Sequence, residues 1–407
     1  MRKNKTLIFL LIIIFFFCNF SYGIEDSMQV VLNDYNFTNE EQNNENNNNE
    51  LIENSDNLET VQKQDNEALQ ENIREGGMYS ESAILIEAKT GKILFEKNIH
   101  DRKFPASTTK VLTAIIAIEK CDLSEKAVAS TSAIEALQDG YTKADIQAGE
   151  TFTIEELLNV LILQSANEAA TIIAEHISGS TEEFAKLMNE KAKEIGCIES
   201  NFVNPNGVHD ENHYSSAYDL AMIARYAMKN ETFRNLVVLK ECSLPHTEFW
   251  GDEQVLEHGE RNFKNTNQLL NPESRYYYQY ANGIKAGFTT PAKNCLIASS
   301  NKNGFEVISV VLHAETTEDN LSARYIDTIN LFEYGYNNYN IDDILKDYNE
   351  NEELDTIESS AEIENKNIEN ENNSQIKSTK IELIEIIIGL SIIILVIIIS
   401  IIRKIKH

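Results

Sequence analysis

Two long acidic, asparagine-rich stretches restrict which part of this chain can fold. Residues 24–76 contain 14 acidic and 2 basic side chains, and residues 342–380 contain 12 acidic and 4 basic ones. They contribute −12 and −8 to a formal net charge of −30. Segments of low hydrophobicity and high net charge cannot bury enough apolar surface to order their backbone. We expect both stretches to be disordered linkers and one folded domain to occupy residues 77–341.

The two ends of the chain carry apolar runs of different character. Basic residues precede "LIFLLIIIFFF" and Ser21-Tyr22-Gly23 follows it, an order typical of a secretory signal peptide over residues 1–23. Residues 381–402 are mostly apolar and about long enough to cross a bilayer. The basic tail at 403–407 is then expected in the cytoplasm, with the folded domain outside a cell membrane that the chain crosses once. A buried core helix is the less favoured alternative for this run.

Strand-like patterns stand at both ends of the expected domain. "SAILIEAKTGKILFEKN" alternates around Thr90-Gly91, and "NCLIASSNKNGFEVISVVLHA" alternates around Asn303-Gly304. Asn-Gly between two such runs is the strongest short hairpin signal. We therefore expect two antiparallel hairpins, one from each end of the domain.

The middle of the domain has helical patterns. "STTKVLTAIIAIEK" is apolar around most of its circumference, as expected for a helix in the domain centre. "TIEELLNVLILQSANEAATIIAEHISG" opens with a capping box, Thr153 and Glu156, and reads as two helices broken near Ser165. "SAYDLAMIARYAMKN" is a third amphipathic stretch. Together the patterns predict an α+β fold, an antiparallel sheet flanked by helices with an inserted helical lobe.

Several observations argue against a metal, a cofactor or nucleic acid. Four cysteines follow the expected signal peptide: Cys121, Cys197, Cys242 and Cys295. Two disulfides are possible, but free thiols are favoured because a domain of this size can bury a hydrophobic core without disulfide bonds. His209 and His213 have the i to i+4 spacing of a zinc pair but lack the glutamate of H-E-x-x-H. The strongly acidic balance disfavours nucleic acid. We expect no metal site and no cofactor.

The first candidate catalytic pair lies in "PASTTK". Ser107 is expected near the N-terminus of the central helix, where free amides favour developing negative charge. Lys110 follows one turn later on the same face, and burial would lower its pKa. A neutral amine beside a hydroxyl is a serine nucleophile with its base. The alternative is a serine cap beside a surface lysine, and the motif alone leaves the two about equal.

Two further polar groups interrupt apolar surroundings. Ser165 and Asn167 stand between two apolar helical turns, where a helix cap is the first interpretation and a proton relay with a substrate-binding amide is the second. In "NGIKAGFTTPAKNC", Lys285, Ala286 and Gly287 precede Phe288 and Thr289. This triplet is either a tight turn or a strand edge that lets a ligand lie against its backbone.

The order of these three elements is more specific than any one of them. Ser-x-x-Lys, then Ser-x-Asn, then Lys-x-Gly resembles the active-site-serine D-alanyl-D-alanine carboxypeptidases, the low-molecular-mass penicillin-binding proteins. Segments such as "FPASTTKVLTAIIAIE", "AGETFTIEELLNVLILQSANEAA" and "NGIKAGFT" resemble those of the family, and the resemblance covers residues 79–340. It implies the serine β-lactamase/transpeptidase-like fold.

The resemblance also implies roles for the site residues. Ser107 would attack the bond between the terminal D-alanines of a peptidoglycan stem peptide, and Lys110 would accept its proton. Ser165 would pass a proton to the departing D-alanine, and Asn167 would hold the substrate amide. Lys285 would supply positive potential, and the backbone amides of Ser107 and Phe288 would form the oxyanion hole. The substrate-binding stretch is Lys285, Ala286, Gly287, Phe288 and Thr289, and β-lactams would acylate the nucleophile.

The chain departs from the family pattern in several places. The third motif usually reads Lys-Thr-Gly, so Ala286 removes a hydroxyl that helps to hold the substrate carboxylate, and Thr289 is a candidate to replace it. Lys89-Thr90-Gly91 has the sequence of the usual motif but falls in the first hairpin turn. We therefore interpret it as turn residues and not as part of the site. The acidic linker and the apolar run stand where relatives often carry a β-sandwich domain. An apolar span replaces the usual amphipathic anchor.

Two other functions stay open. Because of Ala286, the chain could be a weak or inactive homologue that binds cell wall or senses β-lactams. A β-lactamase would share the three motifs. It would also need a deacylating glutamate, and Glu199 lies in "ESNFVN", which lacks the required spacing.

Overall fold

The computed structural model describes residues 77–136, 140–317 and 321–350, together with Gly389. The expected signal peptide, first acidic linker, membrane span and cytoplasmic tail lie outside these residues, Gly389 excepted, and stay predictions. Within the described ranges, no helix is both long enough and apolar enough to cross a bilayer.

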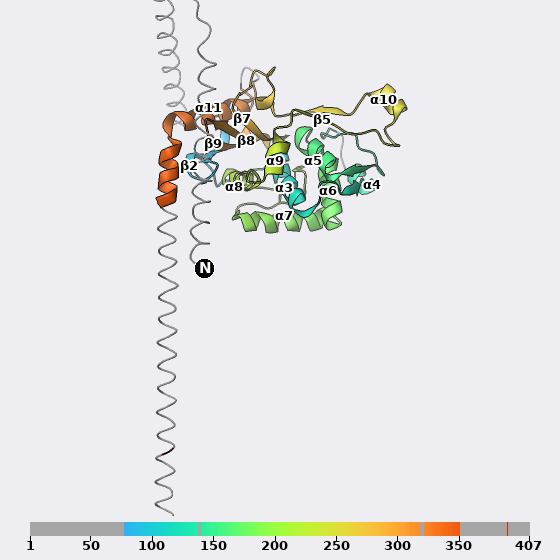
Figure 1. Ribbon diagram of the computed structural model, residues 1–407, viewed down its shortest axis with the longest axis horizontal. Helices are drawn as coiled ribbons and strands as arrows, with labels where there is room; N and C mark the ends of the chain where they lie inside the picture. The colour runs from blue at the N-terminus through green and yellow to red at the C-terminus, as the bar shows by residue number, and fades with distance from the viewer. Residues whose placement is uncertain (1–76, 137–139, 318–320, 351–388, 390–407) are drawn as a thin grey trace, which may run out of the picture. The chain divides into compact units, whose positions relative to one another are not determined.

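A five-stranded antiparallel sheet joins the two ends of the domain, as predicted (Figure 1). Its strand order is β2-β1-β9-β8-β7. The strands are β1 Ser80–Glu87, β2 Ile93–Lys97, β7 Ala281–Thr289, β8 Lys293–Lys302 and β9 Phe305–Ala314. The β8–β9 turn uses Asn303 and Gly304 with φ of 56° and 88°. Both central residues of a type I′ hairpin need positive φ, which is why this dipeptide is found there.

Helices occupy the sequence between β2 and β7. They are α3 Lys110–Lys120, α4 Thr131–Glu135, α5 Ile154–Leu163, α6 Asn167–Ser178, α7 Thr181–Ile195, α8 Ala217–Ala227, α9 Glu231–Val237 and α10 Asp252–His258, with the 3-10 turns η1 Ala106–Thr109 and η2 Gln268–Leu270. Two small hairpins join them, β3 Lys126–Val128 with β4 Thr151–Thr153, and β5 Glu241–Ser243 with β6 Asn262–Lys264. Helix α11, Ala323–Asn338, follows the sheet.

The sheet is buried on both faces. Ile84 and Ile86 of β1 belong to the core cluster that includes α3 and α8, whereas Leu85 belongs to a second cluster with Leu331 and Phe332 of α11. Successive strand residues point to opposite faces, so a strand covered on both sides is apolar throughout. The helical lobe and α11 therefore enclose the sheet, and the predicted α+β fold is confirmed.

Helix α3 lies at the centre of the lobe. Every residue from Lys110 to Ala117 is buried, which confirms the helix predicted to be surrounded by protein. The capping box of α5 is present, with Thr153 and Glu156 each bonded to the other's backbone amide. Between α5 and α6 the chain breaks at Ser165, whose φ is 65°. This break carries a predicted site residue into the neighbourhood of α3.

Two smaller predictions concern the cysteines and the second linker. All four described cysteines are free, and Cys197 and Cys295 are buried, which agrees with the favoured thiol interpretation. Residues 341–350 are helical, and Ile344 is buried against the α11 cluster. The prediction of disorder from residue 342 is therefore wrong for residues 342–350. Ile344 of this acidic segment packs against the domain.

Candidate active site

The predicted nucleophile lies in a tight turn directly before α3. Ser107 is the second residue of η1, and Ala106 before it has a φ of 50°. Gly207 packs under this turn so closely that a β-carbon would lie 1.9 Å from the Ala106 carbonyl oxygen. A non-glycine residue in the left-handed region is strained and persists only where its surroundings enforce it. The turn therefore presents Ser107, which is only partly buried, at a fixed position.

Lys110 is buried beneath Ser107 with three oxygen atoms around its amine. Lys110 Nζ lies 2.9 Å from Ser107 Oγ, 2.8 Å from Asn167 Oδ1 and 2.6 Å from the Asn206 carbonyl oxygen. Burial, with the nearby charge of Lys285 adding to it, holds the pKa of Lys110 well below its usual range. The two carbonyl-type oxygens can only accept hydrogen bonds, whereas a serine hydroxyl can donate. A neutral amine fits this set, with two N–H donors for the carbonyls and a lone pair facing Ser107.

Ser165 and Asn167 come from the break between α5 and α6. Asn167 begins α6, and its Nδ2 donates to the Thr142 carbonyl oxygen at 2.9 Å. Its Oδ1 is the acceptor for Lys110, so the amide orients the base as well as lining the cleft. One Nδ2 hydrogen is left over for a substrate carbonyl. Ser165 lines the same cleft. Asn167 is thus more than a helix cap, because its side chain bridges α3 and the 140–146 segment.

The Lys-Ala-Gly triplet, Lys285 to Gly287, belongs to strand β7. The triplet lies within β7, which is the edge strand of the sheet and lies beside η1. A β-carbon on Gly287 would lie 2.8 Å from the backbone nitrogen of Ser107. Only glycine lets the strand backbone approach the nucleophile turn this closely. The triplet is therefore a strand edge against the nucleophile, and the tight-turn alternative is wrong.

Other members of the triplet segment have distinct surroundings. Lys285 is 1% exposed, and burial together with the charge of Arg324 lowers its pKa to about 7. Ala286 is buried against the α11-side cluster and also borders the cleft. Phe288 is 59% exposed at the rim. Thr289 Oγ1 accepts from the Ala292 amide at 3.2 Å in the β7–β8 turn, so part of its hydrogen-bonding capacity is already used.

A cleft with a volume of about 610 Å³ collects most of the predicted residues. It is lined by Ser107, Ser165, Asn167, Ala286, Gly287, Phe288 and Thr289 among others. Lys110 and Lys285 are buried and are not among the lining residues. The catalytic candidates come from η1 and the start of α3, from the α5–α6 break and α6, and from β7, so three distant parts of the chain meet here.

Arg324 is a cleft residue that the sequence analysis missed. It belongs to α11, lines the cleft, and donates from Nη1 to the Gly287 carbonyl oxygen at 2.8 Å. Its Nε is buried and has no hydrogen-bond partner among the described residues. No motif marks this arginine, because it reaches the cleft only through the packing of α11 on the sheet.

The histidine pair is structural. The Val203 amide donates to His213 Nδ1 at 3.1 Å, so Nε2 carries the proton and donates to Thr109 Oγ1 at 2.8 Å. Burial lowers the pKa of His213 to about 4, which keeps the ring neutral. His209 packs edge-on against Phe104. His213 therefore ties the 203–213 loop to η1 and so supports the nucleophile turn.

Comparison with known proteins places these features in a family. Residues 66–316 match the peptidase S11 family, described as D-alanyl-D-alanine carboxypeptidase. This range covers more than half of the chain and includes Ser107, Ser165 and Lys285. The chain belongs to the D-alanyl-D-alanine carboxypeptidase family. The predicted family resemblance is confirmed.

Individual D-alanyl-D-alanine carboxypeptidases match over the same region. DacF of Bacillus subtilis (strain 168) is 34% identical over 276 residues, which are 66% of this chain and 64% of that protein. The carboxypeptidase of Streptomyces sp. (strain K15) is 29% identical over 259 residues, 61% of this chain and 84% of that protein. The chain therefore spans less than two thirds of the Bacillus protein's length.

The fold of this carboxypeptidase family member matches solved structures too. The crystal structure of the Streptomyces K15 DD-transpeptidase superposes with a TM-score of 0.56 and 28% identity, covering 64% of this chain and 97% of that one. This agreement confirms the transpeptidase-like fold.

Proposed function

We propose that this protein is a serine D-alanyl-D-alanine carboxypeptidase that removes the terminal D-alanine from peptidoglycan stem peptides. The observation that carries the proposal is the placement of Lys110 Nζ 2.9 Å from Ser107 Oγ, in a buried position that lowers the pKa of the amine and so favours its neutral form. A hydroxyl and a neutral amine at hydrogen-bond distance are the minimum for an activated serine.

Acylation follows from this pair. Ser107 Oγ forms a bond to the carbonyl carbon of the penultimate D-alanine while its proton moves to Lys110 Nζ. The carbonyl oxygen becomes an oxyanion, for which the backbone amides of Ser107 and Phe288 are the donors. Ser165 relays the proton held by Lys110 to the leaving nitrogen, the C–N bond breaks, and free D-alanine departs, which leaves Lys110 neutral again. Water then hydrolyses the Ser107 ester and restores the hydroxyl.

The positive charges of Arg324 and Lys285, together with the edge of β7, would orient the substrate. Arg324 supplies a permanent positive charge in the cleft, and Lys285 supplies a second one from beneath it. Both favour a ligand with a free carboxylate, as in a peptide ending in D-alanine. The second Nδ2 hydrogen of Asn167 is the donor for a substrate carbonyl. β-Lactams would enter as mimics of the same peptide and acylate Ser107.

The location follows from the ends of the sequence. A signal peptide over residues 1–23 would export the chain, and the run at 381–402 would anchor it with the tail at 403–407 in the cytoplasm. The catalytic domain would then face the cell wall, where its substrate is.

The presence of Ala286 favours a weaker enzyme as the alternative, down to a homologue that binds cell wall or senses β-lactams without turnover. Fluorescent penicillin distinguishes these outcomes. We expect a covalent adduct on the full-length chain that is absent in Ser107→Ala and unchanged in Ser124→Ala, a control on an exposed loop. We also expect release of free D-alanine from a pentapeptide. An adduct without D-alanine release would favour the sensing homologue, rapid release of hydrolysed drug would favour a β-lactamase, and no adduct would contradict the proposal.

A further inference from the structure

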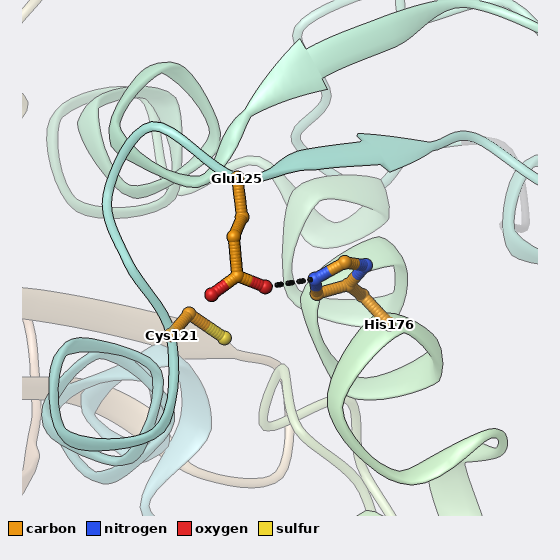
Figure 2. A group of neighbouring side chains, drawn as sticks. All are labelled: Cys121, Glu125 and His176. Atoms are coloured by element: carbon orange, nitrogen blue, oxygen red, sulfur yellow. Dashed lines mark hydrogen bonds and ion pairs between the residues drawn. The ribbon is translucent and has the colours of Figure 1, made fainter.

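The helical lobe carries a second group of chemistry-bearing side chains, which point toward one another (Figure 2) and do not line the cleft. Cys121 caps the C-terminus of α3, Glu125 lies in the following loop, and His176 is in the last turn of α6. One donor atom from each, a sulfur, a carboxylate oxygen and a ring nitrogen, lies within 4.8 Å of both others. We propose that Cys121, Glu125 and His176 form a zinc site.

The donor set fits zinc better than the harder divalent cations. Thiolate and imidazole are preferred ligands of Zn²⁺, and a carboxylate commonly completes three protein ligands with water as the fourth. Bond lengths of about 2.0–2.3 Å at tetrahedral angles require donors roughly 3.3–3.8 Å apart. His176 Nε2 and Glu125 Oε2 are already 3.2 Å apart. Small rotations of exposed side chains would bring the sulfur in.

The surroundings orient the ligands. Glu125 Oε1 accepts from the Asp122 amide at 2.6 Å, which turns the other oxygen of that carboxylate toward His176. Glu175, next to His176, accepts from Ser130 and Ser132 and so ties the end of α6 to α4. Outer hydrogen bonds of this kind fix ligand orientation in metal sites. An ordinary surface ion pair between Glu125 and His176 would need no thiol beside it.

The three side chains lie at the ends of α3 and α6 that are far from the cleft, so a bound zinc would connect these two helices. Helix α3 begins with Lys110 and ends at Cys121, and α6 begins with Asn167 and contains His176 near its end. At about 1.5 Å per residue, the group lies roughly 14–16 Å along both helices from the catalytic end. At that end, Lys110 Nζ donates a hydrogen bond to Asn167 Oδ1 at 2.8 Å. Zinc would join the same two helices at the other end.

Binding includes a proton step. Cys121 is protonated at neutral pH, because burial and the charge of Glu125 raise the pKa of its thiol. Coordination forms a Zn–S bond and releases the thiol proton to solvent, as one zinc-bound water is displaced. The sequence predicts no metal site because these ligands form no short metal-binding motif: Cys121 and Glu125 lie at and after the end of α3, and only tertiary packing brings His176 of α6 beside them.

Cobalt substitution tests the site. The full-length chain, stripped with chelator and kept reduced, is titrated with Co²⁺ up to and beyond an equimolar amount. We expect a thiolate-to-cobalt charge-transfer band that Zn²⁺ abolishes, that is absent in Cys121→Ser and that persists in Cys242→Ser, which changes another half-buried free cysteine. His176→Ala and Glu125→Gln should weaken binding by at least about tenfold.

Two further measurements keep a negative result interpretable. Zinc should raise the melting temperature of the wild type but not of Cys121→Ser, while the two melt alike in chelator. Penicillin should still label Ser107 in every variant, since none of the three residues lines the cleft. No band in wild type, or a band of equal intensity in Cys121→Ser, would overturn the proposal.

Discussion

Gly287 and Ser107 approach each other so closely that a β-carbon on the glycine would lie 2.8 Å from the serine's backbone nitrogen. Real β-carbons do not come that near to another chain atom, so one of the two segments would have to move. The absence of a side chain at position 287 therefore allows the edge strand β7 to lie directly against the turn that carries the nucleophile. Four predictions follow from the geometry around this contact and the cations beside it.

Replacing Gly287 should damage catalysis without removing any reactive group. Gly287→Ala pushes β7 away from η1, and the Phe288 amide moves with it. Loss of one oxyanion donor typically costs about 100-fold to 1000-fold in rate. We expect a fall of this size in the rate of penicillin acylation. Gly251→Ala is the matched control, because the nearest atom to a β-carbon there is 3.8 Å away and its φ of −98° suits alanine. Wild-type acylation in Gly287→Ala would contradict this account of the contact.

The base role of Lys110 predicts that a charged replacement fails. Lys110→Arg replaces an amine that can become neutral with a permanently charged guanidinium that cannot accept the serine proton, so acylation should fall by about 10²-fold to 10⁴-fold. Lys143→Arg, at an exposed lysine near the cleft, should be unaffected. In the wild type, a protonated Lys110 cannot accept the serine proton. Because burial lowers its pKa, acylation should extend to lower pH than an unperturbed lysine would allow and should decline as the pH falls through the lowered pKa. A Lys110→Arg enzyme with normal acylation would exclude the lysine as the base.

The charge on Lys285 should appear as a pH dependence of substrate binding. Its pKa is lowered to about 7, and a lysine is charged below its pKa and neutral above it. The attraction for a substrate carboxylate is therefore present below pH 7 and lost as the pH rises through it. We expect KM for a pentapeptide to rise roughly tenfold across this range, the effect of about 1.4 kcal/mol. Lys285→Met should show a high KM with no such rise, and a flat wild-type profile would rule out this role.

Restoring the family's hydroxyl should improve turnover. Ala286→Thr adds a donor at the border of the cleft, and a hydrogen bond to a charged group contributes about 1.5–3 kcal/mol, or roughly tenfold to a hundredfold. D-Alanine release from a pentapeptide measures the gain. Ala286→Val is the control, because valine has nearly the same shape as threonine but no hydroxyl. Equal rates for Thr and Val variants would mean that the missing hydroxyl does not limit this enzyme.

The sequence alone determined the elements whose signals are local. The spacing of Ser107 and Lys110 places two groups one turn apart on any helix, and Asn303-Gly304 specifies a hairpin turn through its own backbone preferences. The capping box and the apolar surface of α3 are local patterns too, which is why the fold class and the pairing of Ser107 with Lys110 could be predicted.

Only the tertiary structure decided the rest. Asn167 and Asn206 reach the Lys110 amine from 57 and 96 residues away, and Arg324 enters the cleft because α11 packs on the sheet. The reason for glycine at 287 is the distance to a turn 180 residues earlier in the sequence. No periodicity encodes such contacts, because they depend on how buried surfaces of separate elements fit together. The meeting of Cys121 with His176 has the same origin.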